Sequence, residues 1–522
     1  MKILFVYPHI GDGRRRQPKV KRYFPWGVAT VMRCLEDKGH DINLLDIYGN
    51  DLLPHEVKDH LRSQTYECVC ISGFASYNYA YVLWLAQTVK RLQGDIPVIV
   101  GGVLADLHYE LLLTKPDIDI CVLGEGELTA LELCRKMDRL GSVNGIAFKK
   151  EGKIVKTACR ELIKDLDSLP LPNFDLWNMD RYLKGNLWAD DVSTRYKEFP
   201  GNLPKPEQLT PNMSVFFGRG CPFSCKFCSR SYQNVRYKTP VKVIKELKYL
   251  KDKFNIKAFH FYDELVVFRR KTVLELCEKI KPLNVYWDCQ GRVNTVDEDL
   301  MRVMKESNCY SIGFGFESGS TKMLKAMGKG VSREDNLKVL NAAMTTGMHL
   351  KIQLMCGYPG ETEETIAETV SMMKMSKLPP RRMSWATPLP GSVLYQDALA
   401  KGLIKNEEAY LVSLAKLIMN TPKGIVLNVS GLPDDEMIRL YYKSFADMER
   451  NFIHQQIDHF SAFSKDYWYF VKRLILNRLA QMPLFRALYQ LLRSVYHWLQ
   501  RSRSLESDQG LQRHYDLMSA VK

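Results

Sequence analysis

The chain has 522 residues, of which 46% are hydrophobic, 25% are charged and 11% are aromatic. These proportions are typical of globular proteins and exclude a wholly disordered, collagen-like or membrane-embedded chain. Lysine and arginine exceed aspartate and glutamate by 74 to 59, and this net charge of +15 affects the choice of partners only where it is localised.

The sequence shows no sign of export or of membrane insertion. No uncharged apolar run reaches the roughly 18 residues of a membrane-spanning helix, and the first ten residues lack the apolar core and cleavage site of a signal peptide. The 13 cysteines are odd in number and scattered, which favours reduced thiols with a few metal ligands among them over a disulfide framework. We therefore expect a cytoplasmic protein.

Residues 1–143 alternate short hydrophobic stretches with segments of helical periodicity. This order predicts an α/β domain with a parallel, doubly wound Rossmann-like sheet, in which ligands bind beyond the carboxyl ends of the strands. The predicted strands are residues 2–6, 41–46, 68–72, 97–100 and 118–123. The residues at their ends are small or acidic, and the set comprises Ser72, Gly101, Gly102, Gly124 and Glu125.

The rest of the chain divides into three further segments. Residues 144–210 are rich in proline and lack periodicity, which indicates a linker. Residues 211–396 again alternate strands and helices, which predicts a parallel barrel or partial barrel with its active site at the carboxyl ends of the strands. Residues 397–522 are predicted to be mainly helical. The six barrel strands are expected at residues 215–218, 258–262, 285–289, 311–316, 350–356 and 383–387.

Three cysteines, Cys221, Cys225 and Cys228, follow the first predicted barrel strand directly. Three nearby thiolates can hold three irons of a 4Fe-4S cluster and leave the fourth iron open for a substrate ligand. The alternative is a structural zinc site, which needs four closed ligands and usually two CxxC pairs. The chain has no second pair, although His260 could complete such a site.

This motif resembles the signature of the radical S-adenosylmethionine (SAM) enzymes, which is CxxxCxxC with an aromatic residue before the last cysteine. The resemblance continues in order through residues 260–264, 315–320, 357–361 and 388–391, and it covers residues 214 to 396. It implies a partial (β/α)6 barrel. The open iron would chelate SAM, and reductive cleavage of SAM would yield a 5′-deoxyadenosyl radical that abstracts hydrogen from an unactivated carbon.

The resemblance also implies roles for individual residues, beginning with the three cysteines as the cluster ligands. Phe227 would pack near the adenine, Asp263 or Glu264 would accept from the SAM ammonium, Glu317 and Ser318 would bind polar groups of SAM, and Gly357 would permit close backbone approach. For each carboxylate, the alternative is a solvated loop residue.

The first segment resembles the cobalamin-binding domain that precedes this barrel in a large radical SAM subgroup. The matching stretches are residues 71–76, 97–102 and 117–129, and the resemblance implies cobalamin at Ser72, Gly101, Gly102, Gly124 and Glu125. The DxHxxG pattern that donates an axial histidine is missing, since residues 9–13 do not fit it. Cobalamin would then have no histidine on cobalt. A nucleotide site and an empty scaffold remain alternatives, and a dinucleotide site lacks its GxGxxG motif.

A basic amphipathic helix is predicted beyond Leu484. Apolar residues recur at helical spacing, and the opposite face carries Arg486, Arg493, His497 and Arg501. Such a helix can lie in an anionic membrane surface, which would place the protein at the inner face of the membrane and suit a lipidic substrate. Packing against the barrel is the alternative.

The leading hypothesis is a cobalamin-dependent radical SAM methyltransferase that acts on a small or lipidic substrate and takes electrons from a donor such as flavodoxin or ferredoxin. An oxidative cyclase or rearrangement enzyme of the same domain order is the alternative, and product mass would separate the two. An RNA methylthiotransferase would need three more cysteines in the first domain and a small RNA-binding barrel, so nucleic acid is not expected as a partner. A non-catalytic protein would keep its activity in cells when Cys225 is replaced by alanine.

Overall fold

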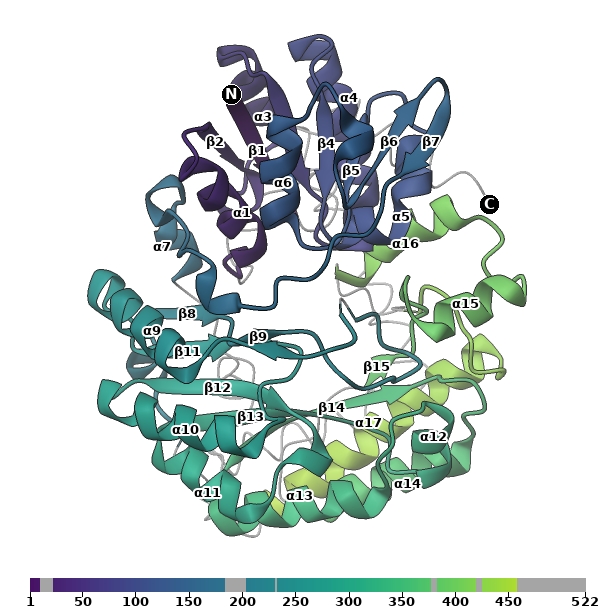
Figure 1. The fold of residues 1–522 in the computed structure, drawn as a ribbon. Helices are drawn as coiled ribbons and strands as arrows, with labels where there is room; N and C mark the ends of the chain where they lie inside the picture. The colour runs from purple at the N-terminus through teal and green to yellow at the C-terminus, as the bar shows by residue number, and fades with distance from the viewer. Residues whose placement is uncertain (10–21, 184–202, 231, 377–382, 419–424, 458–522) are drawn as a thin grey trace.

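The computed structural model describes residues 1–9, 22–183, 203–230, 232–376, 383–418 and 425–457. Two sheets, each with helices on it, lie one above the other (Figure 1). The amino-terminal sheet forms the first unit, and the later sheet with its outer helices forms the second. No helix in the described ranges is long and apolar enough to cross a membrane. The basic helix predicted beyond Leu484 lies outside these ranges.

The first unit is built on a seven-stranded sheet in the order β2-β1-β3-β4-β5-β6-β7. Its first five strands pair in parallel, which confirms the doubly wound sheet. They are β1 (Lys2–Tyr7), β2 (Asp41–Asp46), β3 (Cys68–Ser72), β4 (Val98–Gly101) and β5 (Ile120–Val122).

The sheet continues past residue 143, into the stretch interpreted as a linker. There β6 (Ile146–Lys150) pairs antiparallel with β5, and β7 (Lys153–Lys156) pairs antiparallel with β6. The two-residue turn between them has positive φ at both Glu151 and Gly152, as hairpin turns matched to strand twist require. Glutamate is a rare residue in such a turn, so the sequence carries only a weak signal for this hairpin.

Both faces of the first sheet are buried at β1, as the alternation along this strand shows. Ile3 and Phe5 belong to one apolar cluster, and Leu4 and Val6 belong to another. Successive strand residues point to opposite faces, so β1 is covered on both sides. The longer helices of this unit are α1 (Trp26–Glu36), α3 (Pro54–Ser63), α4 (Tyr79–Gln93), α5 (Val103–Leu113) and α6 (Gly126–Arg135).

The second unit contains a six-stranded, fully parallel sheet in the order β15-β14-β13-β12-β11-β8. The strands follow one another in chain order, which gives the predicted partial barrel. They are β8 (Asn212–Val215), β11 (Ala258–Phe261), β12 (Tyr286–Gly291), β13 (Cys309–Glu317), β14 (His349–Cys356) and β15 (Ser384–Trp385). Beyond β8, the short strands β9 (Gly218–Arg219) and β10 (Arg236–Tyr237) form a separate hairpin.

Helices cover the outer face of this sheet (Figure 1). Three of them begin at a hydroxyl cap: Thr239, Ser332 and Thr362 each accept a backbone N–H from the first helical turn. Such caps satisfy amide groups that the helix itself leaves unpaired. The covering helices are α9 (Pro240–Phe254), α10 (Arg270–Ile280), α11 (Glu298–Glu306), α13 (Arg333–Thr346) and α14 (Glu363–Lys374).

The chain beyond the sixth strand contacts both units. Apolar residues of α15 (Val393–Ala400) and α16 (Glu407–Ile418) join the apolar cluster that contains α4. Lys443 of α17 (Asp434–Ile457) reaches α14, where its Nζ lies 2.6 Å from Oε1 of Glu363. As predicted, the described part of this segment is helical, and it links the two units.

Candidate active site

The three cysteines lie on the loop between β9 and β10, beyond the carboxyl end of β8. Backbone hydrogen bonds tie this loop to two distant segments. The Lys226 N–H donates to the carbonyl of Met327 at 2.9 Å, and the Lys226 carbonyl accepts from the N–H of Leu394 at 2.9 Å. The segment after β13 and the start of α15 therefore hold the middle of the cysteine loop in place.

The thiols lie close enough to influence one another. Burial raises the pKa of Cys221, and it raises the pKa of Cys228 to about 11, with the charges of Cys225 and Glu264 adding to both shifts. Protons would leave these thiols when a metal centre binds, because only thiolates ligate. Three soft donors on one short loop fit an iron–sulfur cluster, in which each cysteine binds a different iron. In the described ranges, no three His, Cys, Asp or Glu side chains surround one point where a single metal ion could bind.

Among the cations near the cysteine loop, Arg292 and Lys329 come from distant segments of the chain, and the sequence analysis did not single out either of them. Nη1 of Arg292 lies 3.4 Å from Sγ of Cys225. Nζ of Lys329 lies 5.7 Å from the centroid of the Phe227 ring. Arg292 comes directly after β12, so its position at the carboxyl end of a strand is a signal that could have found it.

Glu317 is the last residue of β13 and has a φ of +60°. Its Oε1 lies 2.9 Å from Nζ of Lys329, and each of the two side chains is only 9% exposed. The hydroxyl of the next residue, Ser318, lies 3.1 Å from that of Thr369 on α14 and accepts the Ser320 N–H at 3.1 Å. Glu317 and Ser318, the pair expected to bind SAM, thus lie together at the end of β13. There Glu317 is paired with Lys329, and the Ser318 hydroxyl accepts from the backbone of the following turn.

The structure separates the two adjacent carboxylates at the end of β11. Asp263 is buried, and its two oxygens lie 3.0 Å from the Phe217 N–H while Oδ1 also accepts from Gly218. Burial raises the pKa of Asp263 to about 7. Glu264 is exposed, and its charge acts on Cys221 and Cys228. Asp263 therefore supports the backbone that leads into the cysteine loop, and Glu264 faces the thiols.

Gly357, which follows β14, has a φ of +80°. Its N–H donates to Oε2 of Glu361 at 2.9 Å, and Oε1 of the same carboxylate accepts from the Thr365 hydroxyl at 3.0 Å. Glu361 is 3% exposed. Burial raises the pKa of this carboxyl from 4.5 to about 7, because the charged form loses its hydration.

Replacing Glu361 with glutamine is expected to stabilise the protein at pH 8 by about 1–3 kcal/mol. The unfolded carboxyl ionises near 4.5 and the folded one near 7, so its contribution to stability falls as the pH rises through this window. Glutamine carries no charge and keeps an acceptor for Gly357 and a donor for Thr365. Urea unfolding should show the advantage shrinking as the pH falls towards 4.5. A difference that is constant with pH would contradict the assignment.

The residues predicted to bind cobalamin lie together at the strand ends of the first unit. Most of them pack against other parts of the protein and do not border open space. Ser72 pairs with Gly101 across β3 and β4. A Cβ atom on Gly102, whose φ is +88°, would lie 2.8 Å from the carbonyl oxygen of Gly73. A Cβ atom on Gly124 would meet no atom within 4 Å. Gly102 therefore serves the close packing of two strand ends, and Gly124 borders open space.

We expect Gly102→Ala to lower the free energy of unfolding by about 2–3 kcal/mol, because the variant combines a backbone conformation that only glycine adopts easily with a clash against backbone. Gly124→Ala is the matched control. Its φ is +73° but the space around it is open, so a loss of about 1 kcal/mol is expected. Equal losses in chemical denaturation would show that packing plays no part.

Glu125 joins the two units. Its carboxylate is buried and lies 2.7 Å from Arg219 and 2.8 Å from Arg236, both on the hairpin that flanks the cysteine loop. A second carboxylate, Glu127, lies 2.5 Å from Arg219. The sequence analysis assigned Glu125 to cofactor binding, and the structure places its oxygens on the arginines of the second unit.

Aromatic rings lie between the two units. Tyr7 at the end of β1 packs against Phe74, with ring centroids 5.4 Å apart. Phe74 meets Tyr77 at 5.8 Å, and Tyr23 packs against Tyr262 of the second unit at 4.6 Å. Flat apolar faces at the carboxyl edge of a doubly wound sheet fit a macrocycle such as a corrin ring. Single tyrosines scattered along the chain gave no signal of this grouping.

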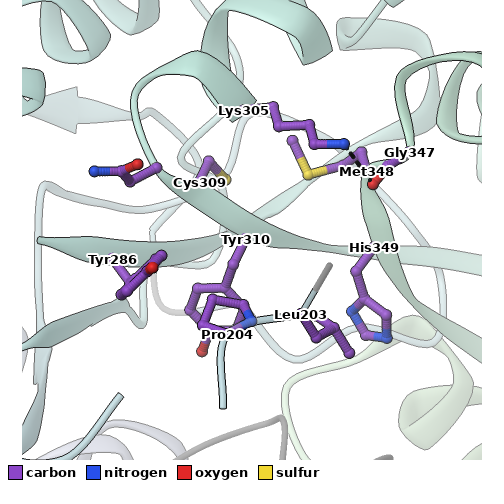
Figure 2. A pocket seen from close by; sticks show the side chains of 10 residues that line it. Leu203, Pro204, Tyr286, Lys305, Cys309, Tyr310, Gly347, Met348 and His349 are labelled. Atoms are coloured by element: carbon purple, nitrogen blue, oxygen red, sulfur yellow. Dashed lines mark hydrogen bonds between the residues drawn. The ribbon is translucent and has the colours of Figure 1, made fainter. Parts of the chain in front are cut away.

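The opposite edge of the second sheet holds a cavity of about 170 Å³ (Figure 2). It lies at the amino-terminal starts of β12, β13 and β14, where Tyr286, Tyr310 and His349 line it. Lys305 closes one side by donating to the carbonyl of Gly347 at 2.9 Å. In parallel barrels this end serves stability rather than chemistry, so the cysteine loop marks the active edge.

Comparisons with known proteins agree with this arrangement. Residues 215–373 match the family model of the radical SAM superfamily, and residues 21–134 match that of the B12 binding domain. An uncharacterised methyltransferase of Pyrococcus horikoshii is 30% identical over 414 residues, which cover 77% of this chain and 84% of the relative. An anaerobic magnesium-protoporphyrin IX monomethyl ester cyclase of Rubrivivax gelatinosus is 27% identical over 428 residues, covering 78% and 72% of the two chains.

A solved structure shares the fold. The cobalamin-dependent S-adenosylmethionine radical enzyme OxsB, with aqua-cobalamin and SAM bound, superposes with a TM-score of 0.62 at 14% identity and covers 99% of this chain and 84% of its own. The fold of this chain, a half-barrel preceded by a doubly wound sheet, is therefore similar to that of a solved cobalamin-dependent radical SAM enzyme. This chain belongs to the radical SAM superfamily and carries a B12 binding domain in front of its radical SAM half-barrel.

Proposed function

We propose that this protein is a cobalamin-dependent radical SAM methyltransferase that acts on an unactivated carbon of a small or lipidic substrate. The observation that carries the proposal is the placement of three cysteines at the carboxyl edge of the half-barrel, where the hairpin that flanks their loop is joined through Glu125 to the strand ends of the first unit. Two cofactors could therefore meet at one substrate. The name of the Pyrococcus horikoshii relative supports methyl transfer.

The chain's own residues would hold the cofactors and position the substrate. Cys221, Cys225 and Cys228 would bind the 4Fe-4S cluster. When bound, the cluster and SAM supply a hydrogen-abstracting radical, and cobalamin supplies a transferable methyl group. Phe227, which belongs to the loop, and Glu264, whose charge acts on the thiols, would contact SAM, whereas Asp263 holds the backbone that leads into the loop. Fixing both reactants on one rigid edge supplies proximity and orientation.

Glu317, which is paired with Lys329, would bind SAM. Its Oε1 lies 2.9 Å from Nζ of Lys329 at the mouth of the sheet, where Ser318 also lies. In the first unit, Gly124 borders open space beside the strand ends and would allow cobalamin to approach. Ser72, Gly101 and Gly102 shape the edge beneath it. Electrons would come from a donor such as flavodoxin or ferredoxin.

Oxidative cyclisation is the second candidate, because the Rubrivivax gelatinosus relative is named as a cyclase. Anaerobically purified protein, supplied with cobalamin, SAM and a reductant, separates the two chemistries. A methyltransferase consumes a second SAM as methyl donor, so S-adenosylhomocysteine should accumulate only when cobalamin is present. Formation of 5′-deoxyadenosine without any S-adenosylhomocysteine would favour the cyclase. Protein that binds iron but no cobalamin would contradict both.

A further inference from the structure

Arg292 makes a contact with a cluster cysteine that none of the roles described above uses. It comes directly after β12, and the residue is 7% exposed. One guanidinium nitrogen, Nη1, lies 3.4 Å from Sγ of Cys225, within hydrogen-bond distance for sulfur. The guanidinium carbon also lies 3.8 Å from the centroid of the Phe223 ring, which belongs to the same loop. A single side chain therefore contacts the cysteine loop through both charge and stacking.

Arg292 is held at its backbone and at its side chain. Its backbone N–H, directly after β12, donates to the Thr295 hydroxyl at 3.4 Å, and that hydroxyl donates to the carbonyl of Val267 at 2.6 Å. On the side of the loop, Phe223 packs edge to face on Phe268 at 5.8 Å. Stacking on one ring leaves the guanidinium N–H groups free to donate within the plane. The contact with sulfur is therefore held by the surrounding packing.

No carboxylate of the described residues lies within ion-pair distance of Arg292, whereas Lys329, which also faces the loop, is paired with Glu317. Nε of Arg292 is buried and has no hydrogen-bond partner among the described protein atoms. Buried donors are nearly always satisfied, so an acceptor that arrives with a bound cluster would complete this site.

Hydrogen bonds to cysteine sulfur and nearby charge are two of the factors that set the reduction potential of an iron–sulfur cluster. A reduced cluster carries one more negative charge than an oxidised one. A fixed cation that donates to a cluster thiolate stabilises the reduced form more strongly than the oxidised form, and burial makes this difference larger than it would be in water.

We propose that Arg292 is a positioning residue that raises the reduction potential of the cluster through its hydrogen bond to Cys225. The step concerned is a one-electron transfer, in which an external donor is oxidised, the cluster gains one electron and no bond to the protein forms or breaks. The inference rests on the proposed function, because it needs a cluster on the three cysteines. On this proposal, Arg292 makes the cluster easier to reduce.

The test is a redox titration, followed by electron paramagnetic resonance, of the anaerobically reconstituted full-length protein. Arg292→Gln removes the charge, and we expect the equilibrium constant for reduction to fall about tenfold, a shift of 59 mV for a one-electron couple. Arg292→Lys keeps the charge but lacks the planar guanidinium that stacks on Phe223. We expect the equilibrium constant for reduction to fall about threefold in this variant. Arg302→Gln is the control, since Arg302 is an exposed residue of α11 paired with Glu298, and its loss should leave the potential unchanged.

Iron and sulfide content is measured on every sample before titration. An unchanged potential in a fully loaded Arg292→Gln variant would overturn the inference and leave the proposed function intact. If Arg292→Gln binds no cluster, the reduction potential of Arg292→Lys is measured instead. An unchanged potential in the lysine variant would also overturn the inference. Wild-type protein that binds no cluster would refute the proposed function itself.

Discussion

Replacing Cys225 with alanine is expected to abolish the reductive cleavage of SAM. With one of the three thiols removed, the loop can no longer hold three irons while leaving the fourth open. The measurement is 5′-deoxyadenosine formation by chromatography after anaerobic reconstitution with iron, sulfide and a reductant. We expect the variant to fall to the background of protein without iron, while its fold, followed by circular dichroism, stays that of the wild type.

Cys159→Ala is the matched control for this experiment. Cys159 is exposed and lies outside the cysteine loop, so its removal should leave both iron content and SAM cleavage unchanged. If the Cys225 variant forms 5′-deoxyadenosine at the wild-type rate, the cluster assignment is wrong. If the wild type binds zinc rather than iron under these conditions, the loop is the structural site considered in the sequence analysis.

Replacing Lys329 with methionine is expected to destabilise the protein by about 3–5 kcal/mol, the cost of leaving a buried carboxylate without its partner. Glu317 and Lys329 are both 9% exposed and 2.9 Å apart, so water cannot substitute for the lost cation. Chemical denaturation in the absence of cofactors measures the effect. The double variant Glu317→Gln with Lys329→Met removes both charges and should recover most of the loss.

The exposed pair between Lys443 and Glu363 provides the control. Its atoms lie 2.6 Å apart, but the side chains are 53% and 46% exposed, and Lys443→Met should cost far less than Lys329→Met because water screens such pairs. Equal losses at the two sites would show that burial does not govern the Glu317 pair. A double variant as unstable as Lys329→Met would show that packing, not charge, is lost.

Local patterns in the sequence predicted the parts of the structure that depend on neighbouring residues. The strands of both sheets were placed within a few residues, because alternating hydrophobicity and turn residues act over short distances. The first barrel strand was placed three residues late, since the residues after Val215 form a separate hairpin. The strands β6 and β7 were missed, because their turn at Glu151 lacks the usual Asn-Gly or Asp-Gly signal.

The partners of the site residues could not be predicted in this way. Arg292 is 67 residues from Cys225, and Glu125 is 94 residues from Arg219. Contacts over such distances depend on which strands are neighbours and where each strand ends. The sequence analysis treated Asp263 and Glu264 as equivalent, and only the position of the Phe217 N–H group distinguishes them.

The sequence by itself determined that three thiols lie on one loop, because eight consecutive residues carry them whatever the rest of the chain does. It also determined the two alternating α/β segments, since their periodicity reflects which side chains must be buried. Only the tertiary structure decided which cations face the loop, that Glu125 joins the two units and that aromatic rings lie between them. These features follow from the packing of whole sheets, in which burial and charge select partners that are distant in the chain.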